Sequence, residues 1–180
     1  MTRRSAIFAL CISAAWGCSS GVYGHSRIYS PLSDEEDALE GAVAYDPVMA
    51  ARDPEGWKSK SVTLFGVVTA RNTGQKGKTD ITLSVRSLEP RNLCETRSED
   101  SCRVTVGDRA HATMHADLQL STDDDIGKHS VGPGSLLRVI GRLNDEVHPG
   151  DGSAVLSASY YRHWPRGFYV TSAAREHMRR

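Results

Sequence analysis

Apolar residues recur at every second position in several runs after Trp57, and this alternation constrains the fold more than any other feature of the chain. Successive side chains of a β-strand point to opposite faces, so each run predicts a strand with one buried face. The first run places Val62, Leu64 and Val68 on one face of its strand. The second run does the same with Ile81, Leu83 and Val85.

The third run covers residues 109–120 and has the most regular alternation. It places His111 and His115 on the polar face, where we expect both histidines to meet solvent. Two further strands are expected over residues 136–143 and 154–161. Gly66 and Gly141 lie inside two of these runs, as is typical of the bends that closed small barrels require.

Five strands in about a hundred residues predict a mainly β fold, a five-stranded Greek-key barrel preceded by a short helix. The helix is expected to begin at a capping box made by Ser33 and Glu36, and to continue through Ala42 and Val43. The barrel core is predicted to contain Val62, Leu64, Val68, Ile81, Leu83, Val85, Ala112, Met114, Leu118, Leu137, Val139 and Leu156.

The N-terminus has the parts of a secretory signal. Two arginines precede ten mostly apolar residues, 6–15, a stretch too short to span a bilayer. The stretch leads to Gly17-Cys18, which resembles the end of bacterial lipoprotein signals. The resemblance implies a lipid on Cys18, and Ser19 after it implies sorting to the outer membrane. Ordinary cleavage that leaves an unmodified cysteine is the alternative.

The predicted strands resemble those of an OB fold and, more narrowly, those of the starvation-inducible (Slp-type) outer-membrane lipoproteins. The resemblance covers about residues 60–168 and depends on Gly66, on LRVIG at residues 137–141 and on Trp164-Pro165. It implies a lipid-anchored barrel and suggests no defined activity. We divide the chain into a lipoprotein signal peptide (1–17), a tether and short helix (18–56), an OB-like barrel (57–171) and a basic C-terminal tail (172–180).

The charge balance gives no sign of a polyanionic partner. Lys and Arg together number 22, as do Asp and Glu, and removal of the signal leaves 20 against 22. We therefore predict no nucleic-acid partner. The sequence also has no nucleophile elbow, P-loop or zinc-protease motif, so we predict no enzymatic activity and no cofactor.

Cys94 and Cys102 are the only cysteines outside the N-terminal segment. An exported chain meets oxidising conditions, so we predict a disulfide between them, with two free thiols as the alternative. No metal site is expected, because four residues along one strand separate His111 and His115 by about 13 Å. The acidic run at residues 123–125 lacks the spacing of a calcium loop and predicts a solvated turn.

An aromatic and basic segment near the C-terminus is the candidate ligand-binding site. It contains Tyr160, Tyr161, Arg162, His163, Trp164 and Arg166. OB folds bind oligosaccharides and nucleic acids on such surfaces, and an exported protein meets glycans. We expect first a structural role, in which the aromatic side chains close one end of the barrel. The alternative is that the segment binds an envelope glycan or a partner protein.

The sequence thus predicts an exported, non-enzymatic protein of the cell envelope, attached by its N-terminal lipid to the periplasmic or surface face of the outer membrane. Its role would be structural or interaction-mediating. The alternative function is an envelope glycan- or peptidoglycan-binding module that uses the segment 160–169.

Overall fold

The computed structural model of this chain describes residues 28–74 and 77–178. The predicted signal peptide (1–17) and the predicted lipidation site Cys18 lie outside the described residues. Within the described ranges, no helix combines the length and the apolar character needed to cross a bilayer.

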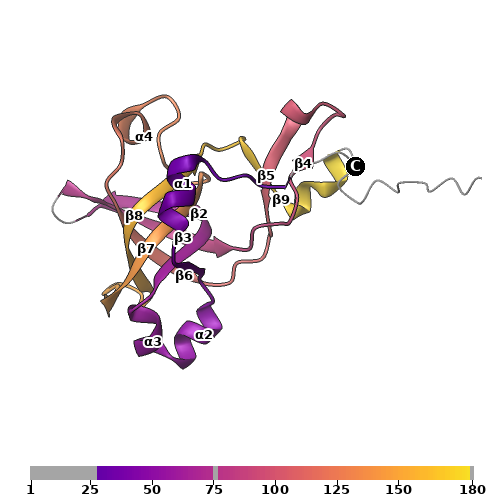
Figure 1. Cartoon of the computed structure of the whole chain (residues 1–180). Coiled ribbons are helices and arrows are strands. Elements are labelled where there is room, and N and C mark those ends of the chain that lie inside the picture. Colours follow the sequence, from indigo (N-terminus) through magenta and orange to yellow (C-terminus); the bar gives the residue numbers. More distant parts are fainter. Residues whose placement is uncertain (1–27, 75–76, 179–180) are drawn as a thin grey trace, which may run out of the picture.

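Five strands close into a barrel, which confirms the predicted fold (Figure 1). The order around the barrel is β2, β3, β6, β8, β7 and back to β2. All neighbours are antiparallel except β6 and β8, which are parallel. This mixed Greek-key closure is OB-like. The strand bounds are β2 (Ser61–Thr73), β3 (Thr79–Arg86), β6 (Thr113–Leu118), β7 (Leu136–Val147) and β8 (Ala154–Trp164).

The barrel core is the one that the alternation predicts. Of the twelve predicted core residues, all are buried except Ala112, which is partly buried and packs against the others. Gly141 lies where the register between β7 and β8 shifts. A Cβ at Gly141 would come within 2.2 Å of the Ser157 carbonyl oxygen, so only glycine fits this bend.

The segment between β3 and β6 forms part of a second sheet that the sequence did not predict. This sheet contains β4 (Leu93–Cys94), β5 (Cys102–Val106) and β9 (Tyr169–Thr171). The short 3-10 helix η2 (Glu99–Ser101) connects β4 to β5. Cys94 and Cys102 are directly opposite each other in the β4–β5 pair, with their Cα atoms 4.0 Å apart, and form the predicted disulfide.

Short elements precede the barrel: α1 (Ser33–Leu39), β1 (Ala42–Ala44), α2 (Pro47–Arg52) and α3 (Pro54–Lys58). Two details of the predicted helix are wrong. The carboxylate that reaches back to the helix start belongs to Glu35, which accepts the Leu32 N–H at 3.1 Å, and not to Glu36. Ala42 and Val43 form β1 and pair with β2, because Gly41 at φ 71° ends the helical path.

Two further short elements complete the described chain. Helix α4 (Thr122–Ile126) lies between β6 and β7, in the acidic run expected to be a solvated turn. The 3-10 helix η3 (Ser172–His177) follows β9 at the start of the predicted basic tail.

Candidate functional site

Strand β8 divides the predicted ligand-binding segment between two sides of the sheet. Tyr160, Arg162 and Trp164 face away from the barrel core, toward α1 and the second sheet. Tyr161 packs against the core cluster, and His163 lies on the same side of the strand as Tyr161. Arg166 follows the strand and is exposed. The six residues therefore do not form one binding surface.

Tyr161 and His163 hold helix α4 through Asp124. The Tyr161 hydroxyl donates to Asp124 Oδ2 at 2.7 Å, and His163 Nδ1 lies 2.6 Å from Asp124 Oδ1. Burial alone would raise the pKa of Asp124, but these hydrogen bonds outweigh it and lower the pKa. Asp124, the middle residue of the acidic run, is therefore held in place by hydrogen bonds and is not part of a solvated turn.

Trp164 belongs to a second apolar cluster between the barrel and the small sheet. Only 9% of Trp164 is exposed, and it packs with Phe65, Val104, Val106 and Leu136. Its ring centroid lies 5.9 Å from that of Tyr29, in the segment before α1. This position fits the structural alternative that the sequence left open for the aromatic residues.

A buried ion cluster lies beside Trp164. Glu35 of α1 is completely buried and accepts hydrogen bonds from Arg138 at 2.7 Å and from Arg162 at 2.8 Å. The two arginines are cross-strand neighbours in β7 and β8. Like charges in that position repel, so the Glu35 carboxylate between them offsets the repulsion.

The Tyr29 hydroxyl also donates to Glu35. Burial by itself would raise the pKa of Glu35, but the hydrogen bonds from Tyr29, Arg162 and Arg138 outweigh it and lower the pKa. Burial, followed by the contact with Glu35, raises the pKa of Tyr29. The positions of Glu35 and Arg138 differ by 103 residues, so no local sequence pattern indicates this contact.

Residues 29–35 therefore cover the outward face of β8 that the sequence assigned to a ligand. Tyr160 at the edge of this face stays partly exposed, and so does Arg162, whose side chain is 23% exposed. The chain itself occupies the part of the face around Trp164.

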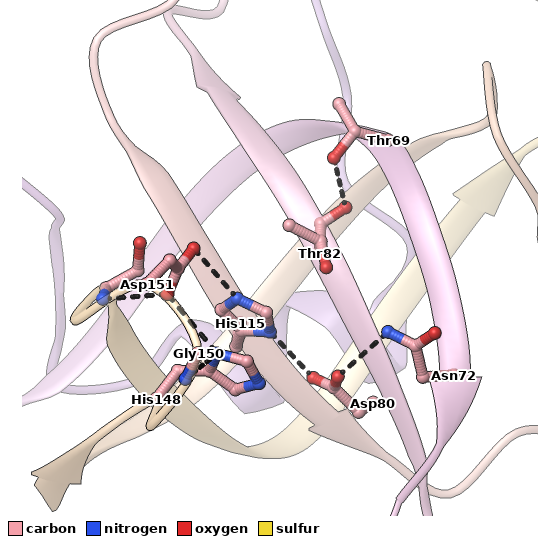
Figure 2. A network of polar contacts seen from close by, with 9 residues as sticks. Thr69, Asn72, Asp80, Thr82, His115, His148, Gly150 and Asp151 are labelled. Atoms are coloured by element: carbon pink, nitrogen blue, oxygen red, sulfur yellow. Dashed lines mark hydrogen bonds and ion pairs between the residues drawn. The ribbon is translucent and has the colours of Figure 1, made fainter.

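A second polar cluster lies on the outer surface of β3 and β6, and Figure 2 shows its side chains converging. His115 of β6 was predicted to meet solvent, and this is wrong, because only 4% of it is exposed. The alternation itself is correct, since Met114 and Ala116 on either side are in the core. The turn between β7 and β8 covers His115.

The cluster around His115 brings together three parts of the chain: β6, β3 and the β7–β8 turn. His115 Nδ1 lies 3.0 Å from Asp80 Oδ1 on β3, and Nε2 lies 3.3 Å from Asp151 Oδ2 in the turn. The rings of His115 and His148 are stacked, with centroids 3.6 Å apart and planes 4° apart. His148 Nδ1 lies 3.2 Å from Asp151 Oδ1. Hydrogen bonds from Ser153, and then from His115, lower the pKa of Asp151.

The position of this cluster matters because OB folds bind their ligands on the faces of their second and third strands and on the adjoining loops. In this barrel those strands are β3 and β6, and the β7–β8 turn is one of the loops. A groove of about 390 Å³ beside the cluster is lined partly by Asp80, Asp117, Glu146 and His148. Sequence reasoning missed the cluster because 33 residue positions, including helix α4 and strand β7, separate His115 from His148.

The comparisons with known proteins identify no family. No protein-family model matches this chain, and no curated protein matches it. Among the solved structures that match is a small single-stranded DNA-binding protein from Streptomyces coelicolor. The two chains are 22% identical with a TM-score of 0.34, and the match covers 58% of this chain and 91% of the other. Such a distant likeness assigns no ligand, and the OB-like fold is established here by the strand order.

The prediction that nucleic acid is excluded as a partner is wrong, because a structure that this chain matches is a single-stranded DNA-binding protein. The exclusion was drawn from the net charge. Net charge averages over the whole surface, whereas binding depends on how charge is distributed locally. The exclusion is withdrawn.

Proposed function

We propose that this chain is an exported, lipid-anchored and non-enzymatic protein of the cell envelope, whose OB-like barrel mediates interactions at the outer membrane. The observation that carries the proposal is the Cys94–Cys102 disulfide. Disulfides persist in oxidising compartments outside the cytosol. This agrees with the secretory features of residues 1–17 and with the position of Cys18.

The contacts of Tyr29 are consistent with a short tether. The Tyr29 ring packs against Phe65 and Trp164, so the chain is fixed to the barrel at this point. Eleven residue steps separate Cys18 from Tyr29. A fully extended chain of that length spans at most about 40 Å. A lipid on Cys18 would therefore keep the barrel close to the membrane surface.

Fractionation of the Cys18→Ser variant tests the proposal. We expect the wild-type protein in the membrane fraction and labelled by radioactive palmitate, and the variant unlabelled and in the soluble fraction. Cys11→Ser is the matched control and should behave like the wild type, because Cys11 precedes the expected cleavage point. A Cys18→Ser variant that stays labelled and membrane-bound would refute the anchor.

A second candidate function is glycan binding at the edge of the aromatic and basic face. The observation that favours it is that Tyr160 and Arg162 on the outward face of β8, and Arg166 just after the strand, all remain at least partly accessible. We expect a Tyr160→Ala, Arg166→Ala double variant to lose binding of peptidoglycan fragments in calorimetric titrations. A single-stranded oligonucleotide belongs in the same titrations, because the structural neighbour binds single-stranded DNA. Binding of neither ligand by the wild type would leave only the first proposal.

A further inference from the structure

We propose that Asp80, His115 and His148 form a binding site for a divalent transition-metal ion of the zinc class. Each residue offers one ligand atom, and these three atoms lie within 4.8 Å of one another. Two ligands of one tetrahedral zinc ion stand about 3.4 Å apart, since each lies about 2.1 Å from the metal. The cluster must therefore close, and one ring must change its orientation, before all three atoms can bind one ion.

Asp151 lies where it can orient both imidazoles. Its two carboxylate oxygens contact one nitrogen of each ring, His115 Nε2 at 3.3 Å and His148 Nδ1 at 3.2 Å. This leaves His115 Nδ1 as a ligand atom, and it already lies 3.0 Å from Asp80 Oδ1. The Gly150 N–H donates to His148 Nδ1 at 3.3 Å, so His148 Nε2 becomes the second imidazole ligand once its proton is lost or moves to Nδ1. Ligand histidines commonly present their second nitrogen to a carboxylate, which fixes the ring orientation.

The ring arrangement indicates which residue has to move. The lone pairs of parallel stacked rings lie in separate planes and do not converge on one point, so one ring must rotate for both to bind. His115 is held in place, because only 5% of its side chain is exposed. His148 is in a turn, and 30% of its side chain is exposed. We expect His148 to rotate and the turn to adjust with it when the ion binds.

The donor set and the surrounding charge select the class of ion. Two imidazoles with a carboxylate suit zinc, copper and nickel, whereas magnesium and calcium prefer oxygen ligands alone. Asp117 and Glu146 line the adjoining groove and add negative charge beside the three ligands. This site lies on the surface that OB folds use for their ligands, so a bound ion would also be accessible to a larger partner.

Zinc titration of the full chain tests the site. Cys11 and Cys18 should be replaced by Ser in every sample, and no histidine tag used, so that no other strong ligand competes. We expect one Zn²⁺ per chain by calorimetry. Co²⁺ in its place should give the visible absorption bands of a low-coordinate site with nitrogen and oxygen ligands.

Three variants distinguish this site from general binding to surface histidines. His148→Ala should weaken zinc binding at least 10-fold, and its place in a turn should leave the fold intact by circular dichroism. Asp151→Asn should weaken binding 10–100-fold, as for other carboxylates that orient a ligand histidine. His111→Ala, an exposed histidine just before β6, should leave binding unchanged.

Two outcomes would overturn the proposal. One is that the wild-type chain binds Zn²⁺ no more tightly than the His148→Ala variant does. The other is an equal loss in His111→Ala and His148→Ala. In either case the His115 cluster serves only to hold the β7–β8 turn against the barrel.

Discussion

Glu35 is a completely buried carboxylate held by two arginines, and its energetics depend on all three groups together. Replacing a complete buried ion cluster by apolar groups is often neutral, whereas removing one member leaves an uncompensated charge. Here the loss of Glu35 would leave Arg138 and Arg162 as adjacent, partly buried cations. Glu35 also connects α1 to the barrel, so its charge couples the N-terminal segment to β7 and β8.

We expect Glu35→Gln to lower the free energy of unfolding by about 3–5 kcal/mol, the range seen when a buried ion pair is broken. The change keeps the size of the side chain and removes its charge. Glu36→Gln is the matched control, because Glu36 is exposed on the same helix. It should change the stability by no more than about 0.5 kcal/mol. Urea denaturation measures both, and equal effects would contradict the role assigned to Glu35.

The lowered pKa of Glu35 also predicts an acid dependence. A carboxylate whose pKa falls on folding stabilises the folded state above its ordinary value of 4.5, and this contribution is lost as the pH falls toward the folded pKa. We therefore expect the stability difference between wild type and Glu35→Gln to shrink as the pH is lowered from about 6 to about 3. The difference isolates Glu35 from other acids with lowered pKa, such as Asp124. A difference that stays constant with pH would exclude this linkage.

At the scale of elements, the backbones of β7 and β8 approach each other closely at Gly141, where the register of the two strands shifts. The register shift there places the Ser157 carbonyl oxygen and the Ala158 Cα where a Cβ would lie. Both are backbone atoms, so they cannot rotate away as a side chain could. The bend therefore has to be made by a residue without a Cβ.

Gly141→Ala should destabilise the protein by at least about 1–3 kcal/mol, the usual cost of overpacking. Gly132→Ala provides the comparison, since a Cβ at Gly132 would meet nothing within 4 Å. Thermal unfolding followed by circular dichroism distinguishes the two. Similar melting temperatures for both variants would show that the strands shift at little cost.

The disulfide stabilises the end of the β4–β5 hairpin, whose connecting residues are mostly exposed. Closing a loop of about nine residues contributes roughly 2.5 kcal/mol in the chain-entropy model. We expect a Cys94→Ser, Cys102→Ser double variant to lose up to that amount. Thiol labelling of the unfolded wild-type chain, with Cys11 and Cys18 replaced, should find no thiol without reductant and two with it. Two reactive thiols without reductant would show that the bond does not form.

At the scale of the whole molecule, stability depends on one barrel core, with a second apolar cluster joining it to the small sheet. Leu83 is fully buried in that core and lies against Gly66 of the neighbouring strand. Leu83→Ala should therefore cost about 2–5 kcal/mol. Ile126→Ala, at a residue that is 78% exposed, should cost little. If the Leu83→Ala and Ile126→Ala variants had equal midpoints of urea denaturation, Leu83 would not contribute to the core as assigned.

The sequence by itself determined the five barrel strands, the two faces of each strand and the disulfide. These follow from local alternation and from the small number of cysteines, which need no knowledge of distant contacts. The same alternation could also have separated Tyr161 and His163 from Tyr160, Arg162 and Trp164, because neighbouring residues of a strand point to opposite faces.

Only the tertiary structure decided what covers each outward face. His115 lies on the outer side of β6, as predicted, and is nevertheless buried, because the turn holding His148 and Asp151 folds over it. Glu35 comes from a helix start and meets two arginines more than a hundred residues away. Periodicity reports which residues share a face. It carries no information about which distant segment packs on that face, because that depends on how the strands close into a barrel.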